Sequence, residues 1–217
     1  MFSFKGVVAA AILAGAATGV SAAVVSIDDF STYPYSTTLN SVGATASDTA
    51  TLTPAIERTI FFERLANGGT TSASANAEVS IADGILELAN DSNVNSRLTL
   101  TYSLDGLFDT GGVTGFDIFV SNSGTAGDGT IQALLNGTSL GTVTLPNGME
   151  GPISFSFSDA LAAGNPDELT FIFSGSPSYD MLIGPITANV PEPGALGLLG
   201  LGVLGMAAAM KRRRAVA

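Results

Sequence analysis

The side chains of this sequence that could do chemistry are almost all carboxylates. The chain of 217 residues contains 19 Asp and Glu but no His, Cys or Trp. Without imidazole or thiol groups, a Ser-His-Asp triad, a cysteine nucleophile and a thiolate zinc site are excluded. A pair of carboxylates, as in glycosidases, is the hydrolytic apparatus that remains. No spacing in the sequence marks two of these carboxylates as facing one cleft. A polysaccharide hydrolase or lyase is therefore only the third of the functions that we consider, after the two given at the end of this subsection.

Calcium is a better match for these groups, because it prefers hard oxygen ligands from Asp, Asn and backbone carbonyls. Asp28 and Asp29 lie near the first predicted strand and Asp180 begins the last. The three carboxylates would meet if the two strands lie side by side. The loops 90–93 and 128–129 are further candidates. The alternative is that all these residues form turns and solvate the surface. A structural Ca²⁺ is therefore the one candidate cofactor.

A short aromatic cluster, Tyr33-Pro34-Tyr35, lies in a predicted loop near the start of the chain's central part. Tyrosine rings can stack on sugar rings, so Tyr33 and Tyr35 are the candidate glycan contacts. They could equally pack over the edge of the fold. Two arginines, Arg58 and Arg64, flank a pair of phenylalanines, and we interpret them as surface ion pairs with the neighbouring Glu57 and Glu63.

Alternation of apolar and polar residues is the dominant pattern between residues 23 and 189, and no apolar stripe of helical period is sustained there. The dipeptides Asp83-Gly84 and Asn136-Gly137 favour type I′ hairpin turns. The sequence predicts an all-β, two-sheet antiparallel sandwich, jelly-roll-like in topology. Residues 40–54 and 67–76 are expected to be exposed loops. The predicted strands are 24–30, 59–65, 77–82, 85–88, 98–104, 116–120, 130–135, 139–145, 153–158, 169–174 and 180–189.

The N-terminal 22 residues have the pattern of a secretory signal peptide. Lys5 is followed by an uncharged, apolar stretch, and small residues precede a cleavage position after Ala22. The alternative, a helix of the mature protein, is disfavoured because the stretch is short and rich in Ala and Gly. We expect a signal helix over residues 1–22.

The C-terminal segment, residues 190–217, has three parts in a fixed order. Pro191-Glu192-Pro193 comes first, an uncharged run over 195–210 follows, and Lys211-Arg212-Arg213-Arg214 ends it. A helix over the run would reach roughly 24 Å, slightly less than the hydrocarbon core of a bilayer. The four cations would keep their end in the cytoplasm, so the central domain would lie outside.

This order of parts resembles the PEP-CTERM sorting signal of exported bacterial proteins. The resemblance covers roughly the last 28 residues. It implies recognition by an exosortase, a membrane-embedded protease that would cut near the Pro-Glu-Pro motif and remove the span. It also implies a place among exopolysaccharides and biofilm matrix. The alternative is a plain C-terminal anchor with a proline-rich stalk.

The central domain, residues 23–189, is strongly acidic. Of the chain's eight cations only Arg58, Arg64 and Arg97 fall within it, against eighteen carboxylates, so its net charge is about −15. Such a charge argues against nucleic acid as a partner. We therefore expect an exported, exosortase-processed surface or matrix protein without catalytic activity, attached to the membrane only transiently. The second choice is a carbohydrate-binding or adhesin module that uses Tyr33 and Tyr35, with or without calcium.

Overall fold

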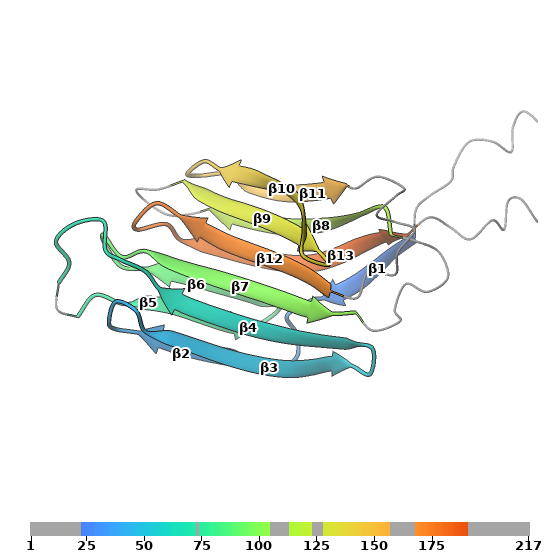
Figure 1. The fold of residues 1–217 in the computed structure, drawn as a ribbon, viewed down its shortest axis with the longest axis horizontal. Coiled ribbons are helices and arrows are strands. Elements are labelled where there is room, and N and C mark those ends of the chain that lie inside the picture. The colour runs from blue at the N-terminus through green and yellow to red at the C-terminus, as the bar shows by residue number, and fades with distance from the viewer. Residues whose placement is uncertain (1–22, 73, 105–112, 123–127, 157–167, 191–217) are drawn as a thin grey trace, which may run out of the picture. The chain divides into compact units, whose positions relative to one another are not determined.

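Alternating sequences fold into β-strands throughout the described part of the chain (Figure 1). The computed structural model describes residues 23–190 apart from 73, 105–112, 123–127 and 157–167. The expected signal helix and C-terminal hydrophobic helix lie outside these residues. The described residues form thirteen strands and no helix: β1 Ala23–Asp28, β2 Tyr35–Leu39, β3 Thr45–Thr53, β4 Ile56–Arg64, β5 Ala77–Ala82, β6 Ile85–Asn90, β7 Ser96–Ser103, β8 Gly115–Asn122, β9 Gly129–Leu135, β10 Thr138–Leu145, β11 Glu150–Ser156, β12 Glu168–Gly175 and β13 Met181–Val190.

The strands form two sheets. Sheet A has the order β11-β8-β13-β6-β5-β2, and β1 pairs with β13 beside this path. Sheet B has the order β10-β9-β12-β7-β4-β3. Every pair whose register is defined is antiparallel. The predicted two-sheet antiparallel sandwich is therefore confirmed.

The inner faces of the two sheets bury one continuous apolar core within Val24–Val190. Sheet A contributes Leu88 and Phe116, and sheet B contributes Phe62 and Phe171, all fully buried. Burying a side chain of this size contributes roughly 1.5–3 kcal/mol, which is why the period of two governs the fold. A core of this kind needs no disulfide, in keeping with a sequence that has no cysteine.

Two tight turns confirm the hairpins expected from the sequence. Asp83 and Gly84 have φ values of 52° and 81°, and Asn136 and Gly137 have 48° and 75°. Two consecutive positive φ values are what a type I′ turn requires. These turns join β5 to β6 and β9 to β10, and so fix the register of both hairpins.

The expectation of an exposed loop over residues 40–54 was wrong, because most of it is strand β3. β3 pairs with β4 along nearly its whole length, although its side chains are mainly Thr, Ser and Ala. It is an edge strand, so only one of its faces meets the core and only at its margin. The neighbouring short strand β2, at the edge of sheet A, was not predicted either. The described residues of 67–76 do form a loop.

Candidate functional site

A buried ion pair joins the two sheets near the end of β1. Arg58 Nη1 lies 2.8 Å from Asp28 Oδ2, and both side chains are almost completely shielded from solvent. Arg58 is on β4, where it shares the inward face with Ile60 and Phe62. Asp28 ends β1 of sheet A, so the pair bridges the sandwich from one sheet to the other.

Tyr102 of β7 completes this buried cluster. Its hydroxyl donates a hydrogen bond to Asp28 Oδ2 at 3.0 Å. Burial raises the pKa of Tyr102 well above its ordinary value, and the nearby Asp28 carboxylate raises it further. The hydroxyl therefore keeps its proton and serves as a fixed donor to the carboxylate.

The same groups hold the loop between β1 and β2 in an unusual conformation. Phe30 and Tyr33 have φ values of 54° and 58°, a region that bulky residues rarely adopt. The Phe30 amide donates to Asp28 Oδ1 at 2.9 Å, and Arg58 Nη2 donates to the Tyr33 carbonyl at 3.1 Å. The Arg58 guanidinium also lies 5.8 Å from the centre of the Phe30 ring.

This anchoring leaves the Tyr33 side chain in solvent. Phe30 is buried, whereas Tyr33 is 51% exposed. Tyr35, at the start of β2, is half-buried, and burial raises the pKa of its hydroxyl. The two predicted glycan contacts thus differ, since only Tyr33 offers much of its ring to a partner.

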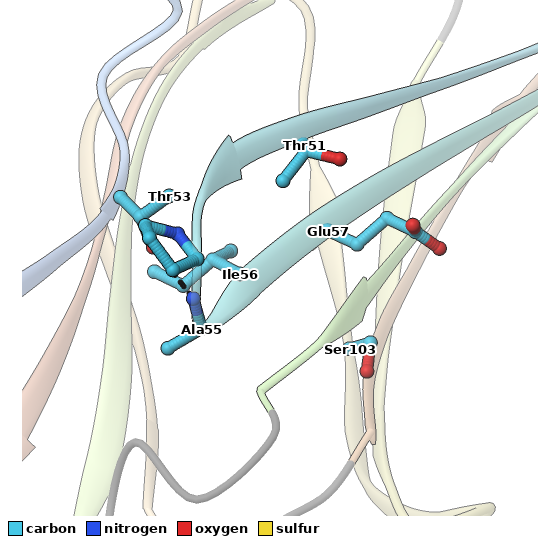
Figure 2. A pocket seen from close by; sticks show the side chains of 7 residues that line it. Thr51, Thr53, Ala55, Ile56, Glu57 and Ser103 are labelled. Atoms are coloured by element: carbon cyan, nitrogen blue, oxygen red, sulfur yellow. Dashed lines mark hydrogen bonds between the residues drawn. The ribbon is translucent and has the colours of Figure 1, made fainter.

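Two hollows lie near the β3–β4 turn, and Thr53 lines both. One, of about 230 Å³, is lined by Ser26, Ile27, Asp28, Asp29, Ser31, Thr32, Leu52 and Thr53. The other, of about 180 Å³, is lined by Thr51, Thr53, Pro54, Ala55, Ile56, Glu57 and Ser103. Figure 2 shows that Thr51, Glu57 and Ser103 of the second hollow come from three strands, β3, β4 and β7. The polar side chains that line both hollows carry hydroxyl groups or carboxylates.

Neither hollow brings together two free carboxylates. Glu57 is the one acid that lines the second hollow. In the first, Asp28 is committed to Arg58, which leaves Asp29. Asp29 accepts hydrogen bonds from the amide and hydroxyl of Ser31, and these bonds lower its pKa. These two hollows are therefore suited to hydrogen bonding with hydroxyl groups, and neither contains the pair of free carboxylates that a glycosidase uses.

The expectation that Asp28, Asp29 and Asp180 share a calcium ion does not agree with the geometry. The Asp29 carbonyl lies against Gly84, just before β6, whereas Asp180 Oδ1 accepts the amide of Asn90 at the other end of β6. Six residues of strand separate these points, roughly 20 Å. Burial raises the pKa of Asp180. The hydrogen bond from the Asn90 amide partly offsets this rise, and the nearby Asp91 carboxylate adds to it. Among the described residues no group of three or more acidic side chains could hold a metal ion.

The interpretation of Arg58 and Arg64 as surface ion pairs was also wrong, because both are buried. Arg64 Nη1 donates to the carbonyls of Leu39 and Ala75, and Nη2 to the side chain of Asn67. Glu63 pairs instead with Arg97 of β7. The sequence did contain a signal, since both arginines are in phase with the apolar residues of β4.

The C-terminal region gives a match to a known family. Residues 189–214 match the PEP-CTERM protein-sorting motif. The match contains Pro191, Glu192, Pro193 and the cationic cluster 211–214. The chain therefore carries the sorting signal of exported exosortase substrates. Within residues 23–190 as described, the structure has no helix that could cross a bilayer.

Comparison of the fold with solved structures finds distant likenesses. A family 11 carbohydrate-binding module from Clostridium thermocellum is 12% identical, with 78% of this chain and 96% of that chain covered and a TM-score of 0.35. The low-affinity xylan-binding module CBM86 from Roseburia intestinalis is 11% identical, with coverages of 68% and 96% and a TM-score of 0.35. No curated protein matches the chain. These likenesses say nothing about ligand or activity.

Proposed function

We propose that this protein is exported, cut by an exosortase next to Pro191-Glu192-Pro193, and kept at the cell surface or in the extracellular matrix as a non-catalytic component. The observation that carries the proposal is the sorting motif over residues 189–214. Residues 1–22 act as the signal peptide, 23–189 form the mature β-sandwich, and 190–217 are the sorting signal. The enzyme recognises the motif while the apolar run holds the chain in the membrane.

The cationic cluster sets the orientation of the precursor. Lys211 to Arg214 stay on the cytoplasmic side, because moving four cations across a bilayer is costly. The preceding run is rich in Gly and only slightly shorter than a bilayer core, which suits a transient anchor. Proline lacks a backbone N–H and disfavours both helix and central strand, so the two prolines of the motif suit a segment that a protease must bind.

The charge of the mature domain supports a partner that is not anionic. Its three cations are all engaged: Arg58 and Arg64 are buried, and Arg97 is paired with Glu63. Phosphate-rich polymers need accessible cations, so nucleic acid is not a partner. Matrix polysaccharides offer hydroxyl groups, which the hydroxyl and carboxylate oxygens around the two hollows can bind.

A second candidate function, glycan binding as a module or adhesin, is favoured by one specific observation. Tyr33 is exposed on a loop whose backbone is fixed by the buried Arg58, beside a hollow lined by Asp29, Ser31 and Thr32. An aromatic residue on a fixed backbone next to hydrogen-bonding groups loses less conformational entropy when a sugar stacks on its ring than one on a free loop would. Tyr35, two residues further along the chain at the start of β2, is the second proposed contact. A calcium-dependent form of this function would need a site other than one shared by Asp28, Asp29 and Asp180.

Mass spectrometry of the surface form tests the main proposal. We expect it to contain neither Met1–Ala22 nor Leu196–Ala217. Replacing Lys211, Arg212, Arg213 and Arg214 by neutral residues is expected to impair membrane retention and processing. Intact termini on the surface form, or unchanged fractionation of the neutral variant, would contradict the proposal.

The second candidate is tested by binding of the released protein to the producing cell's own polysaccharide, with and without calcium. Tyr33→Ala is expected to weaken binding at least several-fold, because it removes the stacking ring. Val42→Ala is the matched control, since Val42 is equally exposed on the next loop. Equal binding by both variants would rule out Tyr33 as the contact.

A further inference from the structure

The outward side of sheet B carries a row of threonines that crosses four neighbouring strands. Thr49 of β3 is opposite Thr59 of β4, Thr59 is opposite Thr101 of β7, and Thr101 is opposite Thr170 of β12. Figure 1 shows these four strands side by side. With strands about 4.8 Å apart, the row is about 14 Å long. Such a length matches a short stretch of an extended polymer rather than a single small molecule.

The hydroxyl groups of this row are already arranged in pairs. Thr49 Oγ1 lies 3.2 Å from Thr59 Oγ1, and Thr101 Oγ1 lies 3.3 Å from Thr170 Oγ1. Each pair shares one hydrogen, so each keeps one hydroxyl hydrogen and several lone pairs for a partner. The pairing also restricts the side chains before any partner arrives, which lowers the entropic cost of binding.

A parallel row two residues along the strands adds an apolar surface. It contains Ser47, Phe61, Thr99 and Ile172 on the same four strands. Phe61 is 41% exposed, whereas its neighbours Ile60 and Phe62 are buried in the core. An exposed ring beside a row of hydroxyl groups has the two kinds of contact that sugars use, namely an apolar face and a polar edge. We call the two rows the hydroxyl face.

The charges around the hydroxyl face select the partner. None of the eight side chains in the two rows is ionisable. On one side Glu63 and Arg97 neutralise each other, and on the other Glu57 and Glu168 flank Ser103 across the sheet. The unpaired glutamates repel anionic polymers and accept hydrogen bonds from hydroxyl groups. A neutral polysaccharide is the polymer that meets these conditions.

From this geometry we infer that the hydroxyl face binds a neutral glycan chain laid across β3, β4, β7 and β12. The site is separate from the Tyr33 loop. The inference rests on the proposed matrix role and extends it, because it specifies that the matrix polymer is neutral. Phe61 supplies the stacking ring, and Thr59 and Thr101 supply the central hydroxyl groups.

Electrophoresis of the full chain through gels that contain a neutral polysaccharide (galactomannan, hydroxyethyl cellulose or dextran) tests this inference. Gels with alginate, which is anionic, run in parallel. The variants are Phe61→Ala and the double change Thr59→Val with Thr101→Val, which keeps shape and β propensity while removing both hydroxyl groups. Phe119→Ala on sheet A is the matched control, because Phe119 is 42% exposed. A double change to Ser restores the hydroxyl groups.

We expect retardation by at least one neutral polysaccharide, weakened about tenfold or more in the Phe61→Ala and Thr→Val variants and retained in the Ser and Phe119→Ala variants. Urea unfolding of each variant separates loss of binding from loss of fold. The inference is overturned if no neutral polysaccharide retards the chain, if alginate does so instead, or if Tyr33→Ala alone abolishes binding. Export and processing are judged separately from the termini of the surface form, so failure of one proposal does not hide failure of the other.

Discussion

The Asp28 carboxylate is surrounded by three donors: the Phe30 amide, the Arg58 guanidinium and the Tyr102 hydroxyl. A buried ion pair is often no more stabilising than an apolar pair of the same volume, but breaking it leaves an uncompensated charge. Here the pair also fixes the backbone that presents Tyr33. The pair therefore has a positional role in addition to its effect on stability.

Asp28→Asn is expected to lower the free energy of unfolding by about 3–5 kcal/mol, because Arg58 then stays buried without a counter-charge. Urea unfolding measures the loss. Glu63→Gln is the control, since the Arg97 side chain of that pair is 47% exposed and the change should cost less than about 1 kcal/mol. Similar losses in the two variants would contradict the role assigned to burial.

Two buried tyrosines make stability depend on alkaline pH. Burial raises the pKa of both Tyr102 and Tyr179 above the ordinary value of 10.0. The unfolded chain therefore loses these protons at a pH where the folded chain keeps them. Their contribution is complete below about pH 10 and is lost as the pH rises beyond it, by up to about 1.4 kcal/mol per pH unit for each tyrosine.

The urea midpoint should accordingly be flat from about pH 8 to 9.5 and fall above pH 10. Tyr179→Phe should make that fall shallower, because it removes one of the two titrating groups, at the cost of the hydrogen bond from the hydroxyl to the Ser96 carbonyl. A midpoint that does not change between pH 9 and 11 would refute the assignment.

At the scale of the strands, the turn residues decide the hairpins. Gly137→Ala should destabilise the fold by about 1–2 kcal/mol, because Gly137 has a φ of 75° and no atom lies within 4 Å of the added methyl group. The cost is thus one of backbone conformation alone. Thermal unfolding measures it, and Gly137→Asn should cost less, since Asn tolerates this region better. If Ala and Asn cost the same, conformational preference is not the cause.

The sequence predicts the central strands well, but it misses β2 and β3, two of the four strands at the ends of the sheets. In β5, β7 and β12 the inward side chains are apolar apart from Ser96 at the start of β7 and Gly175 at the end of β12, and the outward ones are polar or smaller, so the period of two is nearly complete. β3 has only Ala and Leu as apolar residues, and its pairing with β4 comes from backbone hydrogen bonds that leave no pattern in the sequence. Composition gives no sign of that pairing.

The candidate site was predictable only in part. The position of Tyr33 in a loop followed from the neighbouring proline and polar residues. The burial of Arg58 did not, because a charged residue is ordinarily assigned to the surface. Its partner Asp28 is thirty residues away and on the other sheet, so their contact depends on tertiary structure. The hydroxyl face likewise depends on register between strands that are far apart in the chain.

At the scale of the described domain, each of the four strands that end the two sheet orders carries a feature that discourages further pairing. β2 has only five residues, β10 has a bulge between Ser139 and Gly141, and β11 contains Pro152. β3 is longer, but Asp48 is on its inward side, opposite Ile60. Short edges, bulges, prolines and inward charges all oppose edge-to-edge association.

Asp48→Val is expected to promote association of the chain, because it removes the one charge of a nine-residue edge strand and raises its β propensity. Light scattering and size-exclusion chromatography would detect dimers or larger species. Ser47→Val, on the outward side of the same strand, is the control and should remain closer to wild type. Equal association of both variants would show that apolar surface, rather than the inward charge, is what matters.

The engagement of every cation in the mature domain has a consequence for its lifetime outside the cell. Trypsin-like proteases cut after Lys or Arg in flexible backbone, and the domain has no Lys and keeps Arg58, Arg64 and Arg97 within strands. The connecting loops contain neither residue. Such enzymes therefore meet no cleavable bond in the folded domain, and digestion must wait for unfolding.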